Sequence, residues 1–142
     1  MDIYSIRSIS LSPIQFAFLH YNSEIIEIMA PLSDNPNELF PAGCRYTGYT
    51  PIQKAVEIRN LEVIRSLAQF SEIPNAIYLD GWTPIQVAAF GGEANDRISQ
   101  NQDAEIIKIL APLSEHPNAP NPTGWTPIQG LIIYFVETGS LS

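Results

Sequence analysis

The chain has 142 residues, of which 45% are hydrophobic and 15% charged, so its composition excludes a disordered protein and fits one folded domain. Its formal net charge of −8 argues against nucleic acid or an anionic membrane surface as a partner. The longest apolar run is too short to cross a bilayer, and the N-terminus lacks the apolar core of a signal peptide. A single cysteine, Cys44, excludes a disulfide framework and favours a reducing, intracellular and cytoplasmic setting.

A four-residue phrase recurs along the chain, first as Ser-Pro-Ile-Gln at residues 12–15 and then as three copies of Thr-Pro-Ile-Gln. These copies begin at Thr50, Thr83 and Thr126. Ser or Thr is a good helix N-cap, Pro suits the first helical position, and Gln three residues later can bond back to the N–H of the cap. The phrase therefore predicts the start of a helix at each of its four positions.

A second start signal follows in each of the first three units. Asn22, Asn60 and Asp103 are candidate N-caps, and each precedes a Glu that would lie at the positive end of the helix dipole. Apolar residues then recur at i, i+1 and i+4, which is typical of one buried helical face. They are Ile25, Ile26 and Met29, then Val63, Ile64 and Leu67, then Ile106, Ile107 and Leu110. Each unit is therefore predicted to be a helix, a short turn and a second helix.

Prolines indicate where two of the second helices end. Pro31 and Pro112 disfavour a helical conformation in the preceding residue, so these helices should stop near Ala30 and Ala111. Turn-forming residues follow. The chain is then expected to run extended to a glycine just before the next helix, at Gly48, Gly81 and Gly124.

The spacing of the copies gives the repeat period. Thr50 and Thr83 are 33 residues apart, whereas the first interval is 38 residues and the last is 43. The extra residues of the first unit fall in its connecting loop, between Asn37 and Gly48. Those of the third unit fall around residues 93–102, which we predict to be a polar loop between its two helices.

A unit of about 33 residues in which Gly-x-Thr-Pro opens the first helix resembles the ankyrin repeat. The best copy is Gly-Trp-Thr-Pro-Ile-Gln-Val-Ala-Ala at residues 81–89. The resemblance runs from about Leu11 to Tyr134 and implies an all-α, helix-turn-helix solenoid of about three and a half repeats with short hairpin-like loops. The implied division is an N-terminal segment or crude cap at residues 1–10 and a single array at 11–142, with repeats at about 11–47, 48–80, 81–123 and, in part, 124–142.

The chain departs from the family pattern at several positions. Gln stands where the family usually has His, and Ser33, Ser71 and Ser114 stand where it has Gly. Gly130 and Leu131 replace the helix-favouring residue and the Ala of the last unit. The unit-ending Asn is kept, with a preceding Pro, at Asn37, Asn75 and Asn118. Because some proteins resembling this one are substrates of an asparaginyl hydroxylase, modification of one of these residues is one hypothesis.

Catalytic chemistry is not indicated by the sequence. His20 and His116 are far apart in the repeat register, and the chain has no Cys/His pair, Gly-rich phosphate loop or metal-ligand spacing. We therefore expect no enzymatic activity, no cofactor and no bound metal. The resemblance implies instead a protein-protein interaction scaffold that binds a partner protein, of identity unknown, through its concave face and loop tips.

The candidate binding residues are those that the family would place on the concave face and at the loop tips. Tyr49, Trp82 and Trp125 hold the same place in successive units, so stacked units would align them in a column, either as anchors for a partner or as rings that stiffen the stack. Ile58 and Phe90 either join an exposed apolar patch or complete the core. The predicted partner-binding residues are Tyr46, Tyr49, Glu57, Ile58, Tyr78, Leu79, Asp80, Trp82, Phe90, Pro122 and Trp125.

Two further hypotheses concern the third unit and the end of the array. The chain could instead be an inhibitor that occludes an enzyme of a host or competitor with its groove or with loop 93–102. Residues 131–136 are apolar on every face of their helix, whereas terminal units need a polar outer side. We therefore expect this half repeat to be covered by a continuation of a longer chain, by a second copy in a homodimer, or by a partner.

Overall fold

The computed structural model describes residues 10–90 and 97–138. Within these ranges the chain is helical and contains no strand, so the prediction of an all-α protein is confirmed. Two short 3-10 turns, η1 (Ala30–Leu32) and η2 (Ala111–Leu113), extend two of the helices. The helices are α2 (Pro13–Leu19), α3 (Ser23–Met29), α4 (Pro51–Glu57), α5 (Leu61–Phe70), α6 (Pro84–Ala89), α7 (Arg97–Leu110) and α8 (Pro127–Thr138).

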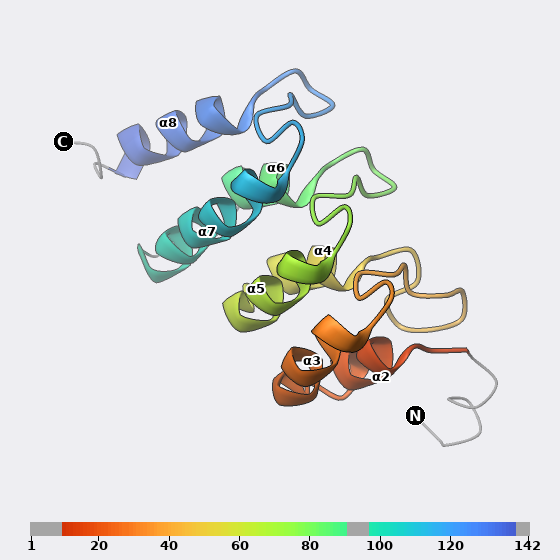
Figure 1. The fold of residues 1–142 in the computed structure, drawn as a ribbon. Coiled ribbons are helices and arrows are strands. Elements are labelled where there is room, and N and C mark those ends of the chain that lie inside the picture. The colour runs from red at the N-terminus through yellow and green to blue at the C-terminus, as the bar shows by residue number, and fades with distance from the viewer. Residues whose placement is uncertain (1–9, 91–96, 139–142) are drawn as a thin grey trace.

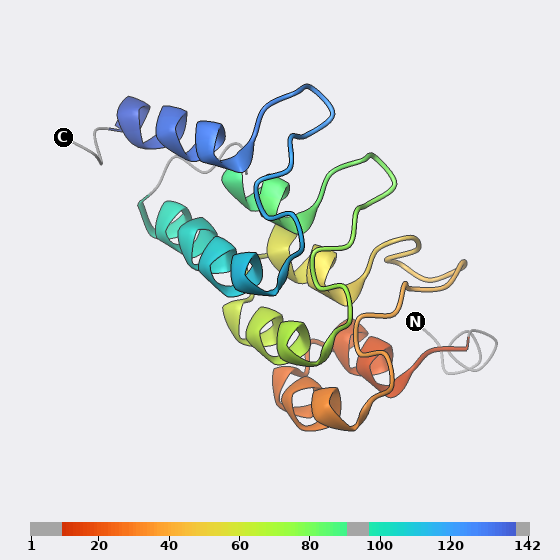
Figure 2. The same ribbon diagram turned by 45° about the horizontal axis from the view of Figure 1, so that its top comes forward.

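The helices lie in two layers, and the connecting loops lie together on one side of them (Figure 1). Consecutive helices pack as pairs, α2 with α3, α4 with α5 and α6 with α7. Each pair then stacks on the next, because α3, α5 and α7 contact one another in sequence, as do α4, α6 and α8. Figure 2 shows the same order after rotation, with α2 and α3 at one end of the stack and α8 at the other.

The four repeated phrases begin helices, as predicted. In α2, α4 and α6 the Ser or Thr hydroxyl accepts from the backbone N–H of the Gln, and the Gln side chain accepts from the N–H of the cap. The same reciprocal pair opens α8, where Gln129 Oε1 lies 2.8 Å from the backbone nitrogen of Thr126. Because the Pro at the first helical position has no N–H, the phrase satisfies most of the donors at a helix start.

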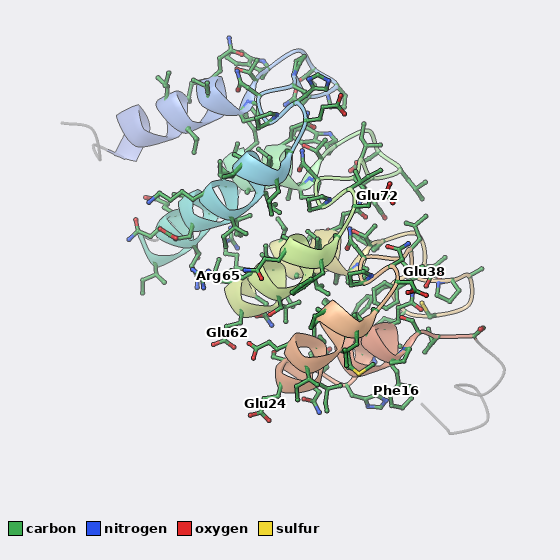
Figure 3. The ribbon with its side chains drawn as sticks, in the orientation of Figure 1. Phe16, Glu24, Glu38, Glu62, Arg65 and Glu72 are labelled. Atoms are coloured by element: carbon green, nitrogen blue, oxygen red, sulfur yellow. The ribbon has the colours of Figure 1, made fainter. Side chains whose placement is uncertain are left out.

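The predicted second-helix caps are confirmed at two of their three positions. Asn22 Oδ1 accepts from the backbone N–H of Ile25 at 3.1 Å, and Asn60 Oδ1 accepts from that of Val63 at 3.2 Å. The two carboxylates expected in the first turns, Glu24 and Glu62, lie at the side of the stack away from the connecting loops (Figure 3).

The third predicted cap, Asp103, was wrong, and so was the extent of the predicted loop at residues 93–102. Helix α7 begins at Arg97 and contains Asp103 in its interior, so residues 97–102 add helical turns instead of a loop. Residues 93–96 lie outside the described part of the chain. Asp103 caps no helix because it lies inside α7, where it and Gln100 are both buried.

The carboxylate of Asp103 is paired with a residue of the preceding unit. Arg59 Nε lies 2.9 Å from Asp103 Oδ1, and Arg59 Nη2 lies 3.2 Å from Oδ2, which is a two-pronged guanidinium-carboxylate contact. Arg59 stands in the turn between α4 and α5 with a φ of 56°, and Asp103 is only 6% exposed. This ion pair therefore ties the turn of one helix pair to the second helix of the next.

The predicted ends of α3 and α7 are confirmed to within a residue. Helix α3 stops at Met29 and α7 at Leu110, and each continues as a 3-10 turn that contains the Pro. Serine hydroxyls then bond the last helical carbonyls: Ser33 Oγ donates to Met29 O at 2.8 Å and Ser114 Oγ to Leu110 O at 2.6 Å. Both serines have extended backbones with negative φ, so a glycine is not required there.

One continuous core runs through the stack. It is built from apolar residues at equivalent positions of successive units, with Ile14, Ile52 and Ile85 each at most 1% exposed. Three rings extend it on the loop side, where Phe18, Phe40 and Tyr46 meet edge to face with centroids 5.5 to 5.8 Å apart. Tyr46 is only 7% exposed, so the structure corrects its predicted place on the binding surface and assigns its ring to the core.

We predict that Arg59→Met lowers the free energy of unfolding by about 2–4 kcal/mol, because it removes the guanidinium from a buried carboxylate. The matched control is Lys108→Met, which breaks an exposed ion pair with Glu105 and should cost about 0.5 kcal/mol or less. Urea denaturation followed by circular dichroism compares the two. Equal losses would show that the pair between Arg59 and Asp103 does not tie the units together.

Candidate partner-binding surface

Each connecting segment is held from both sides by side chains of the repeated pattern. Gln53 of α4 donates through Nε2 to the carbonyl of Ala76 at 2.9 Å. Asn75, the neighbouring residue, accepts through Oδ1 from the backbone N–H of Ile85 at the start of α6, also at 2.9 Å. The segment therefore joins the first helix of one pair to the first helix of the next.

The same two-sided attachment recurs in the other connecting segments. Gln15 donates to the carbonyls of Glu38 and Leu39, at 3.1 and 2.9 Å, while Asn37 accepts from the N–H of Ile52 at 2.8 Å. Gln86 donates to the carbonyls of Ala119 and Pro120, and Asn118 accepts from the N–H of Ile128. The unit-ending Asn thus has a structural role, since it satisfies the one remaining donor in the first turn of the next helix.

Beyond each attachment the chain forms a hairpin-like turn that carries candidate binding residues. Tyr78 N donates to Trp82 O at 2.8 Å, and Asn121 N donates to Trp125 O at 2.7 Å. Gly81 closes the first of these turns with a φ of 88°, a conformation that suits glycine. The predicted glycines therefore stand where expected, but the residues just before them form turns instead of running extended.

Neighbouring turns contact one another at their tips. A Cβ on Gly48 would lie 3.0 Å from the side chain of Leu79, and one on Gly81 would lie 3.2 Å from that of Pro122. Each glycine therefore leaves room for an apolar side chain of the next turn. Leu79 nevertheless keeps 84% of its surface exposed, the largest fraction among the large hydrophobic residues of the described chain.

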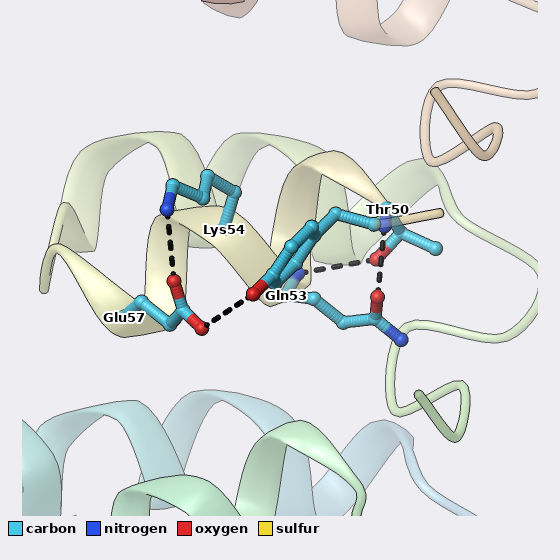
Figure 4. A network of polar contacts seen from close by, with 5 residues as sticks. Thr50, Gln53, Lys54 and Glu57 are labelled. Carbon is cyan, nitrogen blue, oxygen red and sulfur yellow. Dashed lines mark hydrogen bonds and ion pairs between the residues drawn. The ribbon is translucent and has the colours of Figure 1, made fainter. Parts of the chain in front are cut away.

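Tyr49 stands just before α4 and forms a small polar and aromatic network with Lys54 and Glu57, the ion pair that Figure 4 shows on that helix. Its ring stacks on that of Tyr78 with centroids 4.4 Å apart, and its hydroxyl donates to Glu57 Oε1 at 3.2 Å. Glu57 also pairs with Lys54 at 2.9 Å, and Lys54 Nζ lies 5.2 Å from the centre of the Tyr49 ring. Because Tyr78 belongs to the next connecting segment, Tyr49 has the packing role expected of a ring that stiffens the stack.

The surroundings of three tyrosines shift their pKa values. Hydrogen bonding with Tyr78 raises the pKa of Tyr49 well above its ordinary value, and burial and the nearby Glu57 carboxylate raise it further. Burial raises the pKa of Tyr46, whereas hydrogen bonding with Tyr46 lowers that of the exposed Tyr21. The phenol of Tyr49 is therefore neutral at ordinary pH.

Trp82 and Phe90 form a second aromatic pair, with centroids 5.9 Å apart and an edge-to-face geometry. The ring of Phe90 fills the space next to Gly130 of α8, where an added Cβ would lie 2.6 Å from it. Gly130 is therefore needed for contact between these units, which the sequence alone did not suggest. Phe90 is half-buried and contributes to packing, as one of the two predicted alternatives had it.

The remaining candidate residues are exposed along the same series of turns and helix ends. Ile58 is 50% exposed at the end of α4, and Trp125 is 46% exposed before α8. Glu57, Asp80 and Pro122 are exposed as well.

The three rings that were expected to form a column have different surroundings, since Tyr49 pairs with Tyr78 and Trp82 with Phe90. Lys54 was missed, although its spacing from Glu57 signals an ion pair on one helix face.

The chain was compared with family models, curated proteins and solved structures, and no match was found. In the described ranges, no group of three or more His, Cys, Asp or Glu side chains is arranged to hold a metal ion. None of the helices described is both long and apolar enough to span a bilayer.

We predict that Gln53→Ala destabilises the fold by about 2–3 kcal/mol, because it leaves the buried N–H of the helix cap and the Ala76 carbonyl without their partner. Gln129→Ala serves as the control, since Gln129 makes the same cap contact at an exposed position. That substitution should cost about 1 kcal/mol or less. Similar losses in chemical denaturation would mean that the attachment of the connecting segment contributes nothing.

We predict that Gly130→Ala destabilises the fold by about 1 kcal/mol, because steric crowding against Phe90 outweighs the gain in helix propensity. In a Phe90→Ala background the same change should become stabilising by about 0.5–1 kcal/mol. A double-mutant cycle of unfolding free energies measures this reversal of sign. An unchanged sign in both backgrounds would contradict the contact.

Proposed function

We propose that this chain is an ankyrin-type solenoid that acts as a non-catalytic scaffold and binds a partner protein through its connecting turns. The proposal is supported by the helix pairs stacked in order, by the loops gathered on one side (Figure 1), and by the Gly-x-Thr-Pro start of α4, α6 and α8. The binding surface that we propose is called the hairpin strip. It consists of Tyr49, Glu57, Ile58, Tyr78, Leu79, Asp80, Trp82, Phe90, Pro122 and Trp125, and it omits the buried Tyr46.

The observation that carries this proposal is that large apolar side chains in the connecting turns are exposed to solvent. Leu79 is 84% and Trp125 is 46% exposed, and both stand in turns fixed by backbone hydrogen bonds and by the attachments behind them. Apolar residues on a backbone that is already ordered cost less entropy when they bind a partner. Such residues are therefore suited to be the anchors of an interface.

The polar residues of the strip indicate how a partner would be oriented. Glu57 and Asp80 provide carboxylates beside the apolar anchors, while Tyr49 presents a neutral phenol. A surface of this kind selects an apolar patch bordered by basic or hydrogen-bond-donating groups. The alternative inhibitor hypothesis relied in part on a projecting loop at residues 93–102, and residues 97–102 are helical. We therefore base no second function on that segment.

The test is an affinity pull-down with the intact chain, followed by mass spectrometry, using three forms of the bait. These are the unchanged protein, a strip variant with Leu79→Ala and Trp125→Ala, and a control with Leu32→Ala. Leu32 is 71% exposed in η1, outside the hairpin strip. We expect a protein that is retained by the unchanged and control baits and weakened at least about tenfold by the strip variant, a loss of about 1.4 kcal/mol or more.

Circular dichroism of the three baits establishes that each is folded. A partner bound equally well by the strip variant would place the interface elsewhere. Any catalytic activity of the purified chain would contradict the proposal that the scaffold is non-catalytic.

A further inference from the structure

Two adjoining grooves lie between the turns that follow the second helices. One, of about 450 Å³, lies between the turns at 35–39 and 72–76, and the other, of about 360 Å³, lies between the turns at 72–75 and 113–119. Both are in the interior of the stack, with a unit on either side. Because Glu72 and Ile73 line both grooves, we treat them as one surface and call it the turn channel. It is defined by Glu38, Leu39, Glu72, Ile73, Leu113 and Glu115.

The place of the turn channel follows from the repeat. Thr50 and Thr83, which cap α4 and α6, line its two grooves at equivalent positions. Glu72 and Glu115 are also equivalent, since each directly follows the serine that bonds the last carbonyl of a second helix. The side-chain attachments described above hold these turns from both sides. The walls of the channel are therefore fixed before anything binds.

The channel combines exposed apolar side chains with carboxylates. Leu39 is 58%, Ile73 65% and Leu113 45% exposed. Glu38 and Glu72 are exposed as well, and both lie among the connecting loops (Figure 3). Within residues 10–90 and 97–138, neither of these two carboxylates takes part in a side-chain hydrogen bond or an ion pair.

The positive charges of the described chain are used elsewhere. Its ion pairs of Lys and Arg lie on the helices or in the turn before α5. Among the residues described as lining the two grooves, His116 alone is basic, and its Nε2 lies 3.8 Å from Glu115 Oε1. A groove with apolar walls and a negative rim is complementary to a chain that carries Lys or Arg beside apolar side chains.

We propose that the turn channel binds a basic peptide segment in the polyproline II conformation, with an apolar residue at every third position. Helices α3, α5 and α7 pack in sequence, and packed helices lie about 8–10 Å apart, so equivalent positions of successive turns repeat at about that distance. A polyproline II segment has three residues per turn and advances about 9 Å in each turn. Side chains on one face of a β-strand repeat at about 7 Å, which fits less well.

This second surface is separate from the hairpin strip. None of the residues that line the two grooves belongs to the strip. The carboxylates and apolar side chains of the channel stand before the hairpin-like turns in each connecting segment. The proposal therefore goes beyond the proposed function and needs only that the connecting segments are held in place.

The test is a fluorescence-polarisation titration of the intact chain against a labelled peptide made of three copies of Leu-Pro-Lys. Its prolines favour the polyproline II conformation, and its leucines fall at every third position. We expect saturable binding that weakens as salt is added, because salt screens exposed charges. A peptide with Ser for each Leu, and another with Glu for each Lys, should bind at least about tenfold more weakly.

Two substitutions locate the binding. Glu72→Lys reverses the charge that both grooves share, and Ile73→Ser removes the apolar side chain that both share. Each should weaken binding of the Leu-Pro-Lys peptide at least about tenfold. Because both residues are exposed, both variants should remain folded, which circular dichroism checks.

Matched controls make the same changes away from the channel. Glu62→Lys reverses a charge in the first turn of α5, on the side of the stack away from the connecting loops (Figure 3). Ile98→Ser removes an isoleucine of α7 that is 72% exposed. Both controls, and the strip variant with Leu79→Ala and Trp125→Ala, should bind the peptide within about twofold of the unchanged chain.

Four results would overturn the proposal. They are no binding of the Leu-Pro-Lys peptide by the unchanged chain, equally tight binding of the peptide with Ser, equal weakening by Glu62→Lys and Glu72→Lys, and loss of binding in the strip variant alone. The second and third would indicate general attraction of positive charge, and the fourth would move the peptide to the hairpin strip. Because the pull-down uses other variants, either proposal can fail while the other stands.

Discussion

The structure depends on the way in which each connecting segment is held between two first helices. An amide such as that of Gln53 donates to the segment from behind, and an asparagine of the segment, such as Asn75, accepts from the helix in front. Both contacts are buried or partly buried, where an unmatched donor or acceptor is costly. The register between successive helix pairs is therefore fixed by hydrogen bonds, while apolar burial supplies most of the stabilisation.

This arrangement explains why helices of six or seven residues can exist at all. Isolated helices of that length are unstable in water, because few hydrogen bonds offset the entropy of ordering the backbone. In α4, the cap, the proline and the Asn37 side chain together account for the donors of the first turn, and the apolar residues on one face are buried by the neighbouring helices. Each unit thus depends on the units before and after it, as is general for stacked repeats.

Much of this could be read from the sequence because its signals are local. The capping phrase, the prolines at 31 and 112 and the glycines before each helix all specify backbone conformation within a few residues. Asp103 was misread because its role depends on Arg59, which is 44 residues away. Tyr46 was misread for a related reason, since its position in a long connecting loop gives no sign of the rings of Phe18 and Phe40 that surround it. The partners of the exposed residues are likewise non-local, which is why the candidate surface could be named from the repeat pattern but its packing could not.

The most direct test of the central claim is amide hydrogen exchange measured by NMR on the full chain. If connecting segments hold the units in register, the amides of Ile52 and Ile85, which bond to Asn37 and Asn75, should be protected nearly as strongly as core helical amides such as that of Leu67. The amide of Ile128 makes the same bond at an exposed position and should exchange faster. Rapid exchange at Ile52 and Ile85 while the helices remain protected would show that helix pairs fold without these attachments, and would contradict the account.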